Sequence, residues 1–213
     1  MNTRYRPIIG ILLATSVVSC APASFDDDDD TDMVISMRKP DHDFSGYRTY
    51  AITEPVVDLS AAAEDPLQVP HAAVDPIILS SLEQEMNQAG YVRVADAMAD
   101  NPDVVVTPGV VATNNWGWVS YYPWYGYTGY YWYYPPVPVP VNTPTGSVVV
   151  TMVDPNAVQR DDQDRNLVPV IWTGAMRSLL YDESDLESSA ADIPKLMHQM
   201  FKQSPYLKVG GAQ

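Results

Sequence analysis

The segment GSVVVTMV, from Gly146 to Val153, predicts the clearest β-strand in the chain. Valine and threonine are β-branched, and β-branched side chains pack well on a pleated strand. A turn at Asp154 to Asn156 follows, and the segment VPVIWTGAM, from Val168 to Met176, predicts a second strand that pairs back onto the first. These two segments therefore predict a pair of adjacent strands.

Three more strands are expected on the N-terminal side of this pair. Met33 to Met37 alternates weakly, and Tyr47 to Ile52 is rich in residues that favour strands. Asp103 to Thr113 (DVVVTPGVVAT) predicts a strand that is interrupted at Pro108-Gly109, as a bulge or at a sheet edge. The segment from Glu54 to Ala73 contains three prolines and no periodic pattern, and we expect a loop there.

Two helices are predicted from apolar periodicity and from helix-end signals. The first begins at Asp75-Pro76, because an acidic N-cap followed by proline is a common helix start, and it ends at Gly90. The second runs from about Leu186 to Phe201, and Pro194 inside it predicts a kink or a later start. Each helix has one apolar stripe, which predicts one buried face.

The order of these elements predicts the fold class. Strands, a helix, further strands and a closing helix indicate an α+β protein with a two-layer sandwich, a mainly antiparallel sheet and two helices on one face. The order does not alternate regularly enough for a Rossmann-type sheet. We expect a single domain over residues 33–213, with a Tyr/Trp-rich hairpin or loop insertion at residues 115–145.

The first residues have the features of a targeting segment. Arg4 and Arg6 form a basic region, and an apolar region too short to span a bilayer leads to Ser19 and Cys20. This arrangement resembles the bacterial lipobox, in which the cysteine is acylated and becomes the mature N-terminus. Cys20 is the only cysteine of the chain, so we predict a signal peptide at residues 1–19 and lipidation at Cys20. The alternative is an ordinary cleaved signal peptide with an incidental cysteine.

The lipid anchor and the charge together define the expected surroundings. Acyl chains such as palmitate hold a protein on a membrane without a transmembrane helix. Residues 20–32 include five consecutive aspartates, which predict a hydrated tether rather than a calcium site. Without Arg4 and Arg6, ten basic residues stand against twenty-seven acidic residues, a net charge of −17. Such a surface repels phosphate backbones, so a nucleic-acid partner is excluded.

The segment from Asn115 to Tyr134 contains twelve of the twenty-two aromatic residues of the chain. It either packs on its own domain as a hairpin extension or offers a docking surface for an envelope protein or a second copy. Binding of a glycan, such as peptidoglycan or a surface polysaccharide, and insertion at a membrane interface are further alternatives. The candidate interaction residues are Trp116, Trp118, Tyr121, Tyr122, Trp124, Tyr125, Tyr130 and Trp132.

None of the sequence patterns that resemble a catalytic or metal-binding site is complete. The triplet Asp41-His42-Asp43 fits a polar turn better than a metal site, because adjacent residues on an extended chain point to opposite sides. His198 is expected on the polar surface of the last helix. Asp162 to Asn166 resembles the start of an EF-hand loop, but Leu167 stands where glycine is required, and a solvated hairpin loop is expected instead. We predict no enzyme, no cofactor and no metal site, with a hydrolase of unrecognised site as an alternative.

Five short motifs occur in a fixed order along the chain. They are DFSGYRTYAI (43–52), GYVRVADAMADNPDVVV (90–106), GSVVVTMVDP (146–155), IWTGAM (171–176) and QSPYL (203–207). Together they resemble the domain of unknown function 4136 family of bacterial lipoproteins. The resemblance implies no activity, cofactor or functional residues. Ala21 is not the aspartate that retains lipoproteins at the inner membrane, so by analogy we expect the outer membrane, with the domain facing the periplasm.

Overall fold

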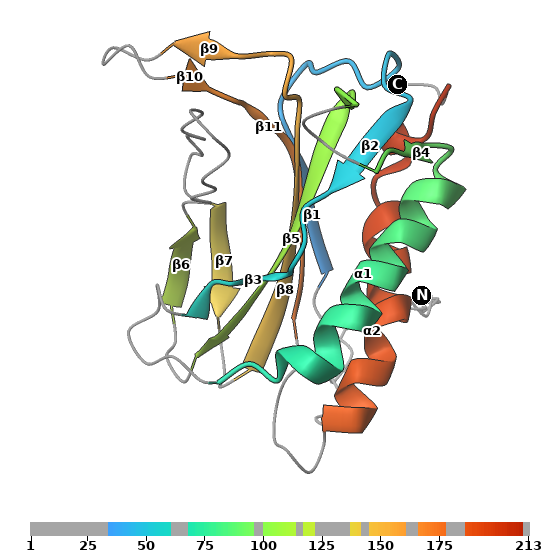
Figure 1. Ribbon diagram of the computed structural model, residues 1–213. Helices are drawn as coiled ribbons and strands as arrows, with labels where there is room; N and C mark the ends of the chain where they lie inside the picture. Colours follow the sequence, from blue (N-terminus) through green and yellow to red (C-terminus); the bar gives the residue numbers. More distant parts are fainter. Residues whose placement is uncertain are drawn as a thin grey trace, which may run out of the picture. The chain divides into compact units, whose positions relative to one another are not determined.

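The computed structural model describes residues 34–60, 68–95, 100–113, 117–121, 137–141, 145–160, 166–177 and 186–210. Its main sheet has seven strands in the order β1-β11-β8-β5-β2-β4, with β3 paired to β5 (Figure 1). The strands are β1 (Val34–Arg38), β2 (Thr49–Ile52), β3 (Val57–Asp58), β4 (Val92–Arg93), β5 (Val104–Thr113), β8 (Thr145–Val153) and β11 (Val170–Arg177).

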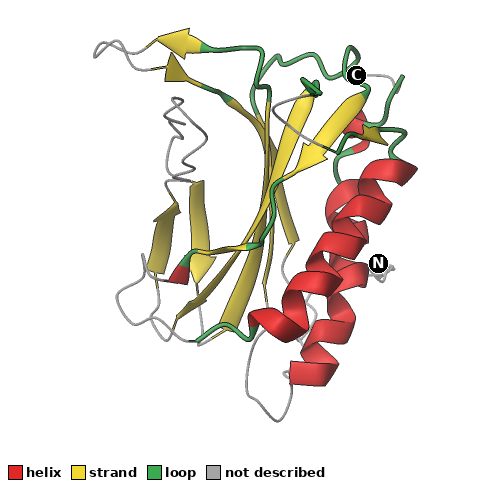
Figure 2. Ribbon diagram, in the orientation of Figure 1, coloured by secondary structure: helices red, strands yellow, loops and turns green. Residues whose placement is uncertain are grey.

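Helices α1 (His71–Gln88) and α2 (Leu186–Lys202) lie on the same face of this sheet (Figure 2). A short 3-10 helix, η2 (Pro205–Leu207), follows α2. The predicted α+β sandwich with two helices on one face is therefore confirmed. Two further two-stranded sheets pair β9 (Gln159–Arg160) with β10 (Asn166–Leu167) and β6 (Gly117–Tyr121) with β7 (Val137–Val141).

The two strands predicted first lie side by side in the sheet. β8 pairs antiparallel with β11 and, on its other side, with β5. β1 adds to β11, also antiparallel. The short strands differ, because β2 pairs parallel with both β4 and β5, and β3 pairs parallel with β5. The long strands thus form the expected antiparallel part of a sheet that is mixed as a whole.

The predicted interruption of β5 at Pro108-Gly109 is wrong. β5 is continuous and stays in register with β8 from Val105↔Val153 to Thr113↔Thr145. The backbone groups of Val106 and Val110 point toward β2 and β3, where they bond to Thr53 and Leu59. Pro108 shares this direction by alternation, so its missing N–H falls at the junction between β2 and β3. A central strand tolerates this proline because no ladder bond is lost there.

The predicted start of the first helix at Asp75-Pro76 is also wrong. α1 begins one turn earlier, at His71, after Pro70, and Pro76 lies inside it. The earlier turn buries Val74 completely, and His71 pairs with Asp75 at the i, i+4 spacing. The expected loop at 54–73 accordingly contains β3 and this first turn.

The other helix-end predictions agree with the structure. Gly90 has φ +95°, and the Tyr91 N–H donates to the Met86 carbonyl, so glycine ends α1 as expected. α2 extends from Leu186 to Lys202 with Pro194 inside it. The two helices and the face of the sheet that they cover enclose the main core. Its largest fully buried side chains include Trp172, Tyr50, Phe44, Ile78, Leu82 and Met152.

The opposite face of the main sheet is buried as well. The positions of β5, β8 and β11 that alternate with the core positions are Val105, Thr107, Val111, Ser147, Val149, Thr151, Val153, Thr173 and Ala175, and all are buried. We call these nine residues the second face. Central strands that are buried on both sides carry nearly continuous apolar runs, which explains the sequences DVVVTPGVVAT and GSVVVTMV.

Candidate functional site

His42, Tyr47 and Asp154 form a hydrogen-bonded chain at one end of the sheet. The Tyr47 hydroxyl donates to Asp154 Oδ2 at 2.8 Å, and His42 Nε2 lies 2.8 Å from the same hydroxyl oxygen. Tyrosine has one proton to donate, and a carboxylate only accepts, so His42 Nε2 must carry the proton shared with Tyr47. The sequence prediction that His42 belongs to a simple polar turn missed this chain, because Tyr47 and Asp154 are far apart along the sequence.

The surroundings of this chain shift two pKa values. Burial lowers the pKa of His42, and nearby Lys39 lowers it further, which together outweigh Asp154 and Asp43. Burial also raises the pKa of the Tyr47 phenol well above its usual range, with the hydrogen bond to Asp154 as the next cause. Both residues are thus held neutral at physiological pH, which suits a structural hydrogen bond.

Asp103 connects the start of β2 to the start of β5. Its Oδ2 atom accepts from the backbone N–H of Arg48 and of Thr49, each at 2.8 Å, and from the Thr49 hydroxyl at 3.0 Å. Burial alone would raise the pKa of Asp103, but the hydrogen bonds from Thr49 and Arg48 outweigh it and lower this pKa. The carboxylate therefore fixes the register of β2 against β5.

The last two motifs contact each other in the core. The indole N–H of Trp172 donates to Ser204 Oγ at 3.0 Å, and both residues are buried. A Cβ built on Gly174 would lie 1.8 Å from Met200 Sδ, so β11 and α2 approach closely there. Tyr206 packs on Phe44, with ring centroids 5.3 Å apart, and the Arg38 guanidinium lies 4.6 Å above the Tyr206 ring.

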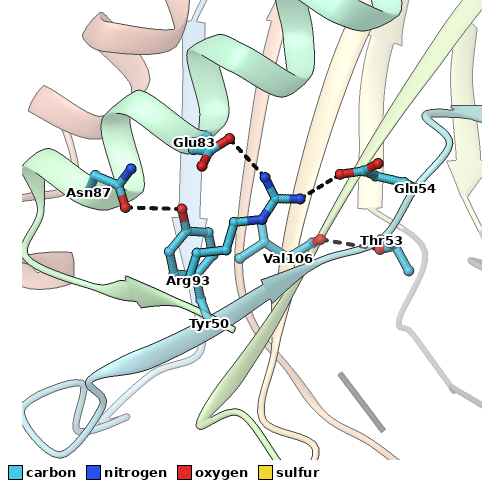
Figure 3. Close-up of polar contacts among 7 residues, drawn as sticks. All are labelled: Tyr50, Thr53, Glu54, Glu83, Asn87, Arg93 and Val106. Atoms are coloured by element: carbon cyan, nitrogen blue, oxygen red, sulfur yellow. Dashed lines mark hydrogen bonds and ion pairs between the residues drawn. The ribbon is translucent and has the colours of Figure 1, made fainter. Parts of the chain in front are cut away.

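A charged cluster lies where the C-terminal end of α1 meets β4. Arg93 pairs with Glu54 and with Glu83, and nearby the Tyr50 hydroxyl donates to Asn87 (Figure 3). The Arg93 and Glu side chains are 35–53% exposed. Exposed ion pairs contribute only about 0–1 kcal/mol, so this cluster is a surface clamp rather than a reactive centre.

Two histidines pair with carboxylates elsewhere. His71 lies between Asp75, at 2.9 Å, and Asp58, at 3.5 Å. Burial alone would lower the pKa of His71, but the hydrogen bonds and charges of Asp75 and Asp58 outweigh it and raise this pKa. His198 is exposed, as predicted, yet its Nδ1 lies 3.1 Å from the buried carboxylate of Glu85, a contact that the sequence did not reveal.

Within the described part of the chain, no group of three or more His, Cys, Asp and Glu side chains could hold a metal ion. Within the same residues, none of the helices is sufficiently long and apolar to traverse a bilayer.

Most of the residues predicted to interact lie outside the described residues. These are Cys20, Trp116, Tyr122, Trp124, Tyr125, Tyr130 and Trp132, together with most of the loop at Asp162 to Asn166. Trp118 and Tyr121 belong to β6, whose backbone pairs with β7 from Gly117↔Val141 to Tyr121↔Val137. The aromatic insertion at residues 115–145 stays a prediction.

The model of a family described as domain of unknown function DUF4136 matches residues 34–206. The chain belongs to the DUF4136 family. A crystal structure of a DUF4136 family protein from Bacteroides thetaiotaomicron matches with a TM-score of 0.60 at 21% identity, covering 84% of this chain and 99% of that chain. This likeness confirms the fold.

Two more distant structures also match this DUF4136 chain. A PelC dodecamer from Paraburkholderia phytofirmans has a TM-score of 0.40 at 15% identity, covering 84% of this chain and 98% of that chain. A PDZ domain protein from Parabacteroides distasonis has a TM-score of 0.45 at 15% identity, covering 84% of this chain and 37% of that chain. No curated protein matches the chain.

The contacts described above join the DUF4136 motifs to one another. Tyr47 of the first motif bonds to Asp154 of the third, and Asp103 of the second bonds to Thr49 of the first. Trp172 of the fourth bonds to Ser204 of the fifth. These polar side chains of the motifs therefore hold strands and helices of the domain together.

Proposed function

We propose that this DUF4136 protein is a lipid-anchored cell-envelope lipoprotein whose domain acts without catalysis, as a binding or scaffolding unit that uses its aromatic segment. The observation that carries the proposal is the mutual engagement of the motif side chains. Tyr47, Asp103 and Trp172 each bond to a residue of another motif, so each of these three side chains has a structural role. We therefore assign the contact with a partner to the segment between β5 and β8.

According to the strand registers, the N-terminal chain and the aromatic segment join the main sheet at the same end. Val34, the first residue of β1, pairs with Met176, and Met176 pairs with Val148 near the start of β8. Thr113 and Thr145, between which the aromatic segment is inserted, are register partners at this same end of the sheet. A tether over residues 21–33 reaches at most about 45 Å when fully extended. The chain that leads back to Cys20 and the chain that leads into the aromatic segment therefore leave the described strands at the same end of the sheet.

The lipid anchor is tested by mass spectrometry of the mature protein from a Gram-negative host. We expect the N-terminal residue to be Cys20 carrying acyl chains, and the protein to fractionate with the outer membrane. Cys20→Ala should release it from the membrane fraction. An unmodified N-terminus, or membrane association that survives Cys20→Ala, would contradict the anchor.

The role of the aromatic segment is tested by replacing residues 122–136 with Asn-Gly, which removes nine of its twelve aromatic residues and keeps β6 and β7. Tyr121 and Val137 are register partners, so a two-residue turn can close β6 onto β7. We expect an envelope protein or second copy that is cross-linked to the intact protein to be lost from this variant. Val92→Ala, which removes a side chain that is 63% exposed in β4, is the matched control and should retain it. An unchanged set of cross-linked partners would refute an interaction role, and retention on purified cell-wall polymer would favour the glycan alternative.

A further inference from the structure

The second face of the sheet needs a cover that the helices do not provide. Its nine residues are valine, threonine, serine and alanine, without a charged side chain. Burying apolar surface stabilises a protein by roughly 25 cal/mol per Å². A solvated face of an antiparallel sheet is mainly polar, whereas five of these nine residues are valine or alanine and the other four are small hydroxyl residues, all of them buried. The second face is therefore built to be packed against something.

Described residues cover its margins only. Leu59 lies over Gly109, where a Cβ would be 2.8 Å from Leu59 Cδ1, and it packs with Val57 and Val111. Val168 and Val170 pack with Val105 and Val153 at one end. At the centre, Val149 and Ala175 form a buried apolar cluster that includes no other described residue. Val149 is nevertheless only 1% exposed and Ala175 only 8%.

The β6–β7 hairpin has one apolar face of matching character. Along its register, Val119 is opposite Val139, and the pairs Gly117↔Val141 and Tyr121↔Val137 flank them. Successive residues of a strand alternate between the two faces, so these six positions share one face of the ladder. The positions of Trp118, Ser120, Pro138 and Pro140 share the other face.

We infer that the β6–β7 hairpin of this same chain covers the second face, with the ladder face that holds the positions of Val119 and Val139 over Val149 and Ala175. The hairpin is inserted between Thr113 and Thr145, the adjacent ends of β5 and β8, and these are the strands whose second face needs the cover. Two sheets that pack face to face lie about 10 Å apart with interdigitated apolar side chains. The domain then has three layers, namely helices, main sheet and hairpin.

This arrangement sorts the aromatic segment into two functions. The ladder face that holds the valine positions of the β6–β7 hairpin stabilises the domain, and the ladder face that holds the positions of Trp118, Pro138 and Pro140 is the outer one. An outward Trp-Pro surface is rigid and uncharged, which suits contact with a partner. The inference itself does not depend on the proposed function, because it holds whether or not Cys20 is acylated or a partner exists.

The test uses pairs of cysteines in the full chain carrying Cys20→Ser, a background free of cysteine. Val149→Cys is combined with Val119→Cys, with Val139→Cys or, as the matched control, with Ser120→Cys on the other face of β6. Dibromobimane is added, because it becomes fluorescent only after both of its arms react with thiols. We expect an intramolecular product with Val119→Cys or Val139→Cys and none with Ser120→Cys.

A labelling measurement keeps the test decisive. Val149→Cys alone should resist maleimide in the folded protein as Val150→Cys of the core does, whereas Val92→Cys should react at once. Ala175→Cys replaces Val149→Cys if the latter does not fold. A bimane product with Ser120→Cys, products that link two molecules, rapid labelling of Val149→Cys, or protection without any bimane product would each overturn the inference.

Discussion

On the helix-facing side of the main sheet, the buried apolar side chains of β5, β8 and β11 belong to one continuous cluster with those of α1 and α2. On the second face, the buried apolar residues that the structure describes fall into three small clusters. The difference lies in what is packed on each face and not in the strands, since neighbours such as Val149 and Val150 are equally buried. The same strands therefore pack against a layer on each of their two faces, and the helices form one of these layers.

The largest expected effect is on the helix-facing side. Trp172→Ala removes a fully buried indole that packs on Phe201, and large-to-small changes of this kind cost about 3–5 kcal/mol of the free energy of unfolding. Urea unfolding followed by circular dichroism measures it. A cost below about 1 kcal/mol would mean that this core is not packed as described.

Substitutions at Gly174, on the helix-facing side, and at Gly109, on the opposite side, compare the packing on the two faces of the sheet. A methyl group at Gly174 would meet Met200 and the Trp172 ring, so Gly174→Ala should cost about 1–3 kcal/mol through overpacking. At Gly109 the new methyl group meets the end of the flexible Leu59 side chain, and Gly109→Ala should cost less than Gly174→Ala. Thermal unfolding of both variants compares them, and the opposite order would contradict the assignment of faces.

Buried hydroxyl groups provide a smaller contrast. Ser204→Ala leaves the buried Trp172 N–H without its acceptor, which should cost about 1–3 kcal/mol. Thr151→Val removes a hydroxyl of the second face whose bond to the Thr107 carbonyl is long, at 3.4 Å, and should change the free energy of unfolding by well under about 1 kcal/mol. A large loss for Thr151→Val would indicate a polar partner on the second face.

A pH titration tests the packing of His42 on Phe44 of the main core, whereas the nine residues of the second face include no titratable group. The pKa of His42 lies below its ordinary value of 6.5, so between these two values the unfolded chain binds more protons than the folded protein. Stability should therefore fall as the pH drops from about 6.5 through the folded pKa. NMR titration of the His42 ring measures this pKa directly, and a midpoint above 6.5 would contradict the described burial.

Much of the fold was predictable because it follows from local patterns. The β-branched runs predicted β5, β8 and β11, and apolar periodicity predicted both helices. The start of α1 was missed because the pairing of His71 with Asp75 and the burial of Val74 outweigh the signal of Asp75-Pro76. The interruption predicted at Pro108 is wrong because Pro108 faces the junction between β2 and β3, where β5 loses no ladder bond. This junction exists because β2 and β3 both pair parallel with β5, and no local sequence pattern reveals that pairing.

The candidate site was less predictable. The chain of His42, Tyr47 and Asp154 joins residues 107 positions apart, so only the fold brings them together. Glu85 lies in the predicted helix but was not singled out, because its partner His198 belongs to the other helix. Cys20 and the aromatic residues carry local signals that the sequence reveals by itself, and their roles stay predictions.

The most direct measurement compares the free energies of unfolding of Val149→Ala and Val150→Ala. The two residues are adjacent, chemically identical and buried, and they differ only in the face of the sheet that they occupy. If the chain covers both faces with packed side chains, each variant loses about 2 kcal/mol. If Val150→Ala is destabilised and Val149→Ala is not, the second face is not packed and the three-layer account is wrong.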